Sequence, residues 1–207
     1  MPRFDNPLAT WNARYAGAEY HFGEAPNAFL RAHAHLLAPG ATALCVADGE
    51  GRNSVFLAQQ GIAVTAFDFA PNAVAKAASL AAKRGVQADH RLGDIYAWDW
   101  PATTYDAVVA IFIQFLPPED RGTVFTGMKR AVKPGGLFLL EGYRPEQIAY
   151  GTGGPPHAAN MYTVEWLRGE FAAWDIRELA SYDAVIDEGP GHVGMSALVD
   201  LVARKPA

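Results

Sequence analysis

Apolar and polar positions alternate in blocks along most of the chain, with short apolar runs separated by segments of helical spacing. Five segments are predicted as strands, at 42–47, 63–68, 86–91, 105–111 and 137–141, and the fourth is apolar along its length. Strands that alternate with helices form βα units, and their strands lie parallel in one sheet. The pattern therefore predicts a doubly wound α/β fold with a mostly parallel sheet and helices on both faces.

The segments between these strands carry the usual signals of helix ends. We expect helices over 27–37, 53–60, 71–84 and from 118 to before Pro134, and a further helix capped by Thr163. The clearest signals belong to the helix at 71–84, where Pro71 takes the first helical position and Gly85 follows the last. Its expected buried face is formed by Val74, Ala78 and Ala81.

The C-terminal part of the chain is organised differently. Two strand-like segments, 178–187 and 193–203, flank the turn Glu188-Gly189-Pro190-Gly191-His192, and no helical segment lies between them. This arrangement predicts an antiparallel hairpin that closes a seven-stranded sheet. We expect the sixth strand to run parallel to the first five, so that the hairpin turn lies at the carboxyl edge of the sheet.

Two segments outside this pattern are candidates for covering a ligand site. Residues 1–30 are aromatic and irregular, and we expect them to form a cover that excludes water. Residues 142–162 are rich in Gly, Pro and Tyr, which we expect to prevent a helix and to form a lid loop. The whole chain, 1–207, has the size of a single domain.

Composition and charge restrict the partners. A net charge of −5 without a basic stretch argues against nucleic acid. The single cysteine, Cys45, excludes an intrachain disulfide and a cysteine-rich zinc site, so we expect no metal and a reducing, cytoplasmic location. The longest apolar run, 107–113, is far too short for a bilayer, and the N-terminus lacks a signal peptide. We expect a small-molecule partner, and the oligomeric state stays open.

Three motifs follow the expected strands in order. Gly49 and Gly51 form a Gly-x-Gly turn between the first strand and a helix, where the backbone can approach a ligand closely. Asp68 ends the second strand, 17 residues after Gly51, where a carboxylate can accept from both ribose hydroxyls of an adenosine ligand. Asp94 follows the third strand, where it could accept from an adenine amino group. Each motif alone also fits a tight turn, a helix cap or a turn aspartate, but their ordered co-occurrence is more specific.

The order of these motifs resembles that of class I methyltransferases, which use S-adenosylmethionine. Two segments are similar to the tellurite-resistance and thiopurine methyltransferase-like branch: Trp11-Asn12-x-Arg14-Tyr15 and Gly51-Arg52-Asn53-Ser54-Val55-Phe56-Leu57-Ala58. The loop 150–155 and the tail 187–194 resemble bacterial members of that branch with unassigned substrates. The resemblance covers essentially the whole chain and implies methyl transfer to a small-molecule acceptor.

The resemblance also implies which residues contact S-adenosylmethionine or its product S-adenosylhomocysteine. They are Tyr15, Asp48, Gly49, Gly51, Arg52, Asn53, Asp68, Phe69, Asp94, Ile95 and Ile111. The chain departs from the family at the first strand, where Cys45 replaces the usual acidic residue and Ala47 replaces the usual first glycine. We interpret Cys45 as buried packing and expect Asp48 or Arg14 to compensate in holding the methionine end.

Methyl transfer from a sulfonium is a direct displacement, so the protein mainly aligns the reactants and excludes water. The chain lacks the Asn/Asp-Pro-Pro-aromatic motif of amino-methylating DNA enzymes and the Pro-Cys nucleophile of cytosine C5 enzymes. No base motif is evident, which permits a soft thiol or chalcogen acceptor. The candidate acceptor-site residues are Phe112, Gln114, Tyr143, Arg144, His157, Tyr162 and His192.

Among these residues, we expect His192, Arg144 and Tyr143 to be catalytic. His192 would take a proton or hold an anionic acceptor, with Asp187 or Glu188 setting its tautomer or charge. The structural alternatives are an exposed hairpin histidine for His192 and a surface ion pair for Arg144.

Two other functions fit part of the pattern. A non-catalytic module that senses S-adenosylmethionine or S-adenosylhomocysteine would carry the same cofactor motifs. A pocket beside the methyl group, open to a second ligand, separates an enzyme from such a sensor. A nicotinamide-dependent oxidoreductase also uses a Gly-rich turn and an acidic residue. Here, however, Ser54 stands where the third glycine of its fingerprint would be, and the final hairpin also argues against it.

Overall fold

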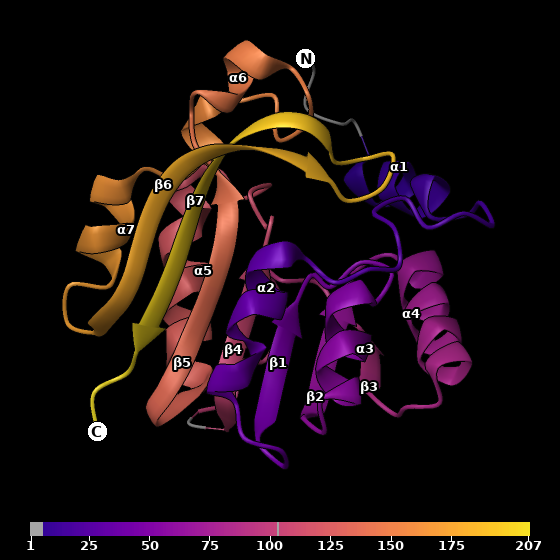
Figure 1. Ribbon diagram of the computed structural model, residues 1–207, viewed down its shortest axis with the longest axis horizontal. Helices are drawn as coiled ribbons and strands as arrows, with labels where there is room; N and C mark the ends of the chain where they lie inside the picture. The colour runs from indigo at the N-terminus through magenta and orange to yellow at the C-terminus, as the bar shows by residue number, and fades with distance from the viewer. Residues whose placement is uncertain (1–5, 103) are drawn as a thin grey trace. The chain divides into compact units, whose positions relative to one another are not determined.

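The computed structural model describes residues 6–102 and 104–207. Seven strands form one mixed sheet in the order β3-β2-β1-β4-β5-β7-β6 (Figure 1). β2 pairs in parallel with β1 and with β3, β4 pairs in parallel with β5, and the last two strands form an antiparallel hairpin. This sheet and its helices confirm the predicted fold class.

The chain divides into two compact units. The first unit contains the residues up to Trp98 together with the turn Glu188–Gly191, and the second contains Asp99–Asp187 and His192–Ala207. The elements of the first unit are α1 (Pro7–Arg14), α2 (Ala28–His33), a 3₁₀ turn (Ala34–Leu36), β1 (Thr42–Val46), α3 (Arg52–Gln59), β2 (Ala63–Asp68), α4 (Pro71–Arg84) and β3 (Asp89–Leu92). Those of the second unit are β4 (Tyr105–Ile111), α5 (Pro118–Ala131), β5 (Val132–Tyr143), α6 (Gln147–Tyr150), a 3₁₀ turn (Ala158–Asn160), α7 (Val164–Glu170), β6 (Asp175–Asp187) and β7 (Val193–Arg204).

In the first unit, β1, β2 and β3 lie parallel and in register. Val46 lies opposite Phe67, and Asp68 lies opposite Leu92. The carboxyl ends of these strands therefore lie at one edge, and the Gly-x-Gly turn begins there. Residues 43–46 of β1 are buried, as expected of a strand that is covered on both faces.

The buried face of α4 differs from the predicted stripe. Ala73, Ala77 and Leu80 are buried, whereas Val74 is half-buried and Ala78 is exposed. The prediction is therefore wrong for Val74 and Ala78, since the residue before each of them is the buried one, and it is right for Ala81. The reason is that the small side chain of Ala77 faces the Gly-x-Gly turn, where a Cβ on Gly51 would lie only 2.7 Å from it.

The expectation of an irregular N-terminal segment is wrong for residues 7–14, which form α1. Asn6 caps this helix, because its Oδ1 accepts from the Ala9 N–H at 3.0 Å, and Pro7 takes the first helical position. An Asn-Pro pair is a helix start signal, and here it outweighs the aromatic composition that follows.

The third strand also starts later than expected, at Asp89 rather than Val86. The Val86 N–H donates to the Ala81 carbonyl at 3.1 Å, so Val86 belongs to the turn that caps the C-terminus of α4. Its side chain packs on the cluster of Val55, Leu80 and Ala81. The segment 86–91, predicted as a strand, therefore begins with residues that cap a helix.

In the second unit, β5 pairs in parallel with β4 and antiparallel with β7, and β7 pairs antiparallel with β6. β6 therefore runs in the same direction as β5, as predicted, and the hairpin turn follows the carboxyl end of β6. β5 is longer than expected because Val132 already pairs with Tyr105, before Leu137 pairs with Ala107.

The expectation that glycines and prolines exclude a helix from residues 142–162 is also wrong. This segment contains α6 and a 3₁₀ turn. Gly151 follows α6 in the left-handed region, with φ at +63°, so this glycine ends a helix instead of preventing one. The next helix begins as predicted, because the Thr163 hydroxyl accepts from the Trp166 N–H at 3.1 Å.

Within the part of the chain that the structure describes, no helix has both the length and the apolar composition that a membrane span requires.

Candidate functional site

The turn between β1 and α3 has an unusual backbone. Ala47, Gly49 and Gly51 all have positive φ, at +48°, +62° and +90°. A left-handed conformation is costly for a residue with a Cβ, so Ala47 is strained where the resembling family has glycine. Gly51 has no room for a side chain, because Ala77 of α4 packs directly against it. The glycines are therefore needed both for the path of the chain and for close packing.

Asp68 joins the end of β2 to this turn. Its Oδ2 accepts from the Gly49 N–H at 3.0 Å, and its Oδ1 accepts from the Ala70 N–H at 2.9 Å. Only 5% of Asp68 is exposed, and burial raises the pKa of its carboxyl group, opposed by the hydrogen bonds from the backbone. The structure thus brings the first two predicted motifs into direct contact.

Asp48 has a different environment from the one we expected. Its carboxylate accepts from both the hydroxyl and the backbone N–H of Ser54, in the first turn of α3. The Ser54 hydroxyl also lies 3.0 Å from Nε2 of His90 on β3. Burial raises the pKa of Asp48 to about 7, although the Ser54 hydrogen bonds oppose this shift. Its carboxylate therefore supports the start of α3.

Glu50, between the two glycines, has contacts that the sequence did not predict. Its Oε2 accepts from the His21 N–H at 2.7 Å, and its Oε1 forms an ion pair with Lys76 of α4. The Lys76 ammonium also donates to the carbonyls of Gly17 and Glu19, at 3.0 and 2.6 Å. Glu50 thus links the N-terminal segment, the turn and α4. One signal for this link was present in the sequence, because a charged residue between two glycines of a buried turn needs partners of opposite charge or hydrogen-bond donors.

The N-terminal aromatic residues pack beside the same turn. Tyr15 is buried, stacks on Trp11 with ring centroids 5.6 Å apart, and contacts Phe22. A Cβ on Gly49 would lie 3.5 Å from the Tyr15 hydroxyl. Burial, followed by the nearby Asp68, raises the pKa of Tyr15. Phe69, which follows Asp68, packs on the same aromatic cluster.

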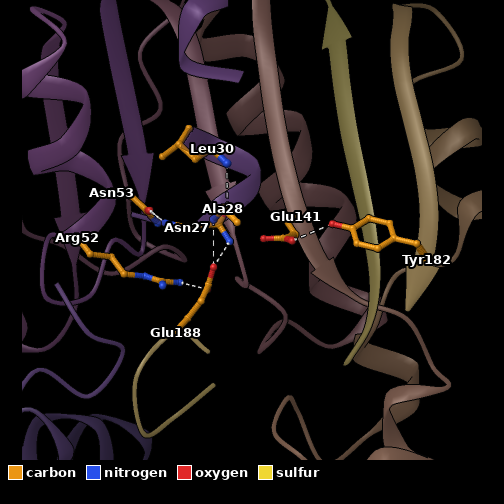
Figure 2. Close-up of polar contacts among 8 residues, drawn as sticks. All are labelled: Asn27, Ala28, Leu30, Arg52, Asn53, Glu141, Tyr182 and Glu188. Carbon is orange, nitrogen blue, oxygen red and sulfur yellow. Dashed lines mark hydrogen bonds and ion pairs between the residues drawn. The ribbon is translucent and has the colours of Figure 1, made fainter. Parts of the chain in front are cut away.

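Arg52 and Asn53, in the first turn of α3, contact segments that lie far away in the sequence (Figure 2). Nη2 of Arg52 lies 2.7 Å from Oε2 of Glu188 in the hairpin turn, and Oδ1 of Asn53 accepts from the Asn27 N–H at 3.0 Å. Glu188 also accepts from the side chain of Asn27 at 3.0 Å. We expected Glu188 to orient His192, whereas these contacts direct its carboxylate to Arg52 and Asn27.

The motif after β3 is more exposed. Asp94 is exposed and accepts from the Tyr96 N–H at 3.0 Å, as in an Asx turn, whereas Ile95 is buried. Trp98 folds back onto β2 and stacks on Phe67, with ring centroids 3.9 Å apart.

In the second unit, three predicted residues form an aromatic cluster. The rings of Phe112 and Tyr143 lie 4.7 Å apart, and His192 lies 4.5 Å from Phe112 and 5.8 Å from Tyr143. Only 7% of His192 is exposed, so it is not a solvated hairpin residue. Phe112 follows Ile111 at the end of β4 and has φ at +55°. Such a conformation is a genuine outlier for a bulky residue, and strain of this kind clusters at functional sites.

The other predicted acceptor residues have local partners or lie at the surface. Arg144 forms an ion pair with Asp183. Gln114 is buried and bonds to the backbone of Tyr143, donating to its carbonyl at 2.6 Å. Tyr162 is buried, and His157 is exposed.

A second group in this unit was missed. Glu141 and Asp200 are register partners on β5 and β7, and both are buried. The Tyr182 hydroxyl of β6 donates to Asp200 at 2.8 Å and to Glu141 at 3.4 Å, and Figure 2 shows the contact with Glu141. The sequence signal for this group was weak, because Glu141 and Asp200 each stand alone in an apolar run.

Comparison with known proteins supports the resemblance. A family profile described as a methyltransferase domain matches residues 43–136. The chain is 29% identical over 161 residues to an uncharacterised methyltransferase of Synechocystis, which covers 76% of this chain and 68% of that protein. It is 33% identical over 132 residues to the phosphatidylethanolamine N-methyltransferase of Cereibacter sphaeroides, which covers 61% of this chain and 63% of that protein.

Solved structures show the same fold. One, from work on the conversion of a disulfide bond into a thioacetal group during echinomycin biosynthesis, has a TM-score of 0.77 and 20% identity, and covers 97% of this chain and 94% of that one. The N-methyltransferase NodS of Bradyrhizobium japonicum, in complex with S-adenosylhomocysteine, has a TM-score of 0.72 and 17% identity. The match covers 98% of this chain and 100% of that one. TehB of Haemophilus influenzae has a TM-score of 0.71 and 20% identity. The match covers 96% of this chain and 66% of that one.

These findings give the chain the class I S-adenosylmethionine-dependent methyltransferase fold. They confirm the predictions that it is a methyltransferase and that its cofactor is S-adenosylmethionine.

Proposed function

We propose that this chain transfers the methyl group of S-adenosylmethionine to a small-molecule acceptor in the cytoplasm, as a member of the tellurite-resistance and thiopurine methyltransferase-like branch. The observation that carries the proposal is the bond from Gly49 to Asp68, which joins the glycine turn to a buried carboxylate at the end of β2. A turn of this kind beside a carboxylate suits the ribose of an adenosine ligand.

The residues of the first unit fit this cofactor. Asp68 accepts backbone hydrogen bonds from Gly49, Ala70 and Phe69, and an ionised carboxylate has about four acceptor positions. Asp68 therefore keeps an acceptor position for a ribose hydroxyl. Gly49 and Gly51 present backbone without side chains beside it. Arg52 has a buried guanidinium nitrogen that is left over for an anionic group.

When it is bound, the cofactor supplies a methyl group that its sulfonium already activates. The chain's own residues then have to hold the adenosine, orient the methionine end and exclude water. Asp68 would hold the ribose. Tyr15, Trp11 and Phe22 form an apolar cluster beside Gly49 and Asp68 that would keep water from the sulfonium.

For the acceptor, the group of Phe112, Tyr143 and His192 supports a soft nucleophile such as a thiol or a chalcogen oxyanion. Its surroundings are aromatic, and a soft nucleophile needs no strong base once it is ionised. His192 would take a proton from the acceptor or hold its negative charge. The likeness to TehB is in keeping with this branch.

An amine acceptor is the second candidate. The observation that favours it is that two similar proteins, from Cereibacter sphaeroides and Bradyrhizobium japonicum, are N-methyltransferases.

Two experiments test the proposal. Calorimetry should show saturable binding of S-adenosylhomocysteine, weakened by Asp68→Ala but not by Asp99→Ala, which changes an exposed aspartate. Binding of NADH without binding of S-adenosylhomocysteine would contradict the cofactor. Next, S-adenosylhomocysteine formation should be measured with aryl thiols, a thiopurine, selenite, tellurite and primary amines. Turnover of thiols or chalcogens supports the proposal, and turnover of amines alone supports the second candidate. Cofactor binding without turnover of any acceptor supports a sensor.

A further inference from the structure

Arg52 is a buried cation that is only partly satisfied. It is the first residue of α3, directly after Gly51, and 7% of its side chain is exposed. Nη2 forms an ion pair with Oε2 of Glu188 at 2.7 Å. Nη1 is also buried, and among residues 6–102 and 104–207 no atom accepts a hydrogen bond from it.

A buried charged donor without an acceptor is energetically unfavourable. An unsatisfied buried polar group costs about 1–3 kcal/mol, and more when it is charged. Native structures contain few such groups, and each one calls for an explanation such as a missing ligand. The geometry around Nη1 therefore points to an acceptor that the protein itself does not provide.

The guanidinium is also held in a fixed orientation. Glu188 accepts from Nη2 of Arg52, from Nδ2 of Asn27 at 3.0 Å and from the Ala28 N–H at 3.1 Å (Figure 2). Asn27 is fixed in turn, because its backbone N–H donates to Asn53 and its Oδ1 accepts from the Leu30 N–H. With Nη2 held by this group, Nη1 cannot be satisfied by a simple rotation of the side chain.

The position suits a carboxylate. Arg52 lies at the N-terminus of an eight-residue helix, where the helix dipole favours negative charge. A guanidinium nitrogen forms a strong, charge-assisted hydrogen bond to a carboxylate oxygen. The residues expected to hold the methionine end are occupied differently: Asp48 bonds to Ser54, and Arg14 is exposed and stacks on Trp11.

We propose that Arg52 binds the α-carboxylate of the cofactor's methionine moiety through Nη1, while Glu188 holds the guanidinium through Nη2. This inference rests on the proposed function and assigns the end of the cofactor that the departure at Cys45 leaves open. Arg52 is a binding residue in this arrangement, and Glu188 is a positioning residue that acts through it.

The test compares two ligands that differ in the methionine moiety. S-adenosylhomocysteine carries the carboxylate, whereas 5′-methylthioadenosine has the same adenosine and a sulfur atom but no amino acid part. By calorimetry, Arg52→Gln should weaken S-adenosylhomocysteine about 10- to 100-fold, as expected for one hydrogen bond to a charged group. It should leave 5′-methylthioadenosine within about twofold. Arg84→Gln, which removes an exposed cation on α4, should change neither affinity.

Three results would overturn the inference. Equal loss of both ligands in Arg52→Gln would show that Arg52 only supports the fold. No loss of S-adenosylhomocysteine would show that Arg52 does not contact the carboxylate. A selective loss in Arg14→Gln, with Arg52→Gln unaffected, would move the contact to Arg14. Failure of the wild type to bind either ligand would instead refute the proposed function.

A second measurement does not depend on the folding of a variant. The wild type should bind decarboxylated S-adenosylhomocysteine about 10- to 100-fold more weakly than the parent compound, and with a smaller dependence on salt. Equal affinity for the two compounds would overturn the inference without any substitution.

Discussion

Gly51 lies directly against Ala77: a Cβ on Gly51 would be 2.7 Å from both the Cα and the Cβ of Ala77. The first turn of α3 is therefore packed on α4 without space between the two backbones. Because Gly51 also has φ at +90°, two separate physical effects require a glycine at this position.

Gly51→Ala should lower the free energy of unfolding by about 2–4 kcal/mol, from left-handed strain together with overpacking. Gly85→Ala is the matched control, because Gly85 has φ at +68° and open space around it. It should cost only about 1 kcal/mol, from strain alone. Urea denaturation measures both values. Adding Ala77→Gly to Gly51→Ala should recover part of the loss, and equal costs for the two single variants would contradict the packing argument.

Ala47→Gly should stabilise the fold by about 1 kcal/mol. Ala47 has φ at +48°, and a left-handed conformation costs a residue with a Cβ about 1–2 kcal/mol, partly offset by the greater freedom of glycine in the unfolded chain. Ala75→Gly, at an exposed position inside α4, should instead destabilise by about 1 kcal/mol. The opposite signs, measured by thermal unfolding, are the expected result. Destabilisation by Ala47→Gly would show that this turn is not strained.

Stability should also depend on pH through Asp48. Burial raises the pKa of Asp48 to about 7, well above its value in an unfolded chain. The folded state therefore binds more protons between about pH 4 and pH 7, and the contribution of Asp48 to stability is lost as the pH rises through about 7.

Asp48→Asn removes this titration. Its free energy of unfolding, relative to the wild type, should increase between about pH 5 and about pH 8, by about 1.4 kcal/mol for each unit of pKa difference within that window. Burial lowers the pKa of His90, so its contribution to stability increases as the pH rises. His90 is present in both proteins, and its contribution largely cancels in the difference. Asp99→Asn, at an exposed position, should show a flat difference. A flat difference for Asp48→Asn as well would refute the argument.

Tyr182→Phe should destabilise the second unit by about 1–3 kcal/mol. The tyrosine hydroxyl donates to two buried carboxylates, those of Asp200 and Glu141, and its removal leaves them without that donor. Tyr150→Phe is the control, because Tyr150 is about as exposed as Tyr182 but its hydroxyl donates, at 3.0 Å, to the exposed carboxylate of Asp183; it should stay within about 0.5 kcal/mol. Similar costs in chemical denaturation would show that burial of the pair contributes little.

His192→Ala should lower kcat/KM about 100-fold if His192 is a general base, measured with the acceptor identified in the panel. A loss confined to KM would assign His192 to acceptor binding. His157→Ala, at an exposed position in the segment 142–162, is the control and should leave the kinetics unchanged. Wild-type kinetics in His192→Ala between about pH 6 and pH 9 would remove His192 from the mechanism.

Local patterns were sufficient for much of the fold. β2 and β4 have the predicted bounds, 63–68 and 105–111, because apolar runs bounded by turn residues define buried strands on their own. The contact between Gly49 and Asp68 could also be anticipated, because parallel strands that are neighbours in the chain bring their carboxyl ends to one edge.

Other features depended on competition between local signals. The helix at 7–14 was missed because its cap, Asn6-Pro7, is only two residues long and precedes an aromatic segment. The stripe on α4 was misplaced because its buried face is set by contact with Gly51, which the period of the helix does not specify.

The remaining features required the tertiary structure. Arg52 and Glu188 are 136 positions apart, and their ion pair exists only because the hairpin turn packs in the same unit as α3. Glu141 and Asp200 become neighbours through the register of β5 and β7, and a shift of one residue would turn their side chains to opposite faces. The sequence determined which residues could bind, because spacing along one strand or helix is local. Which charges meet was decided by pairing between distant segments, for which a single sequence carries no local signal.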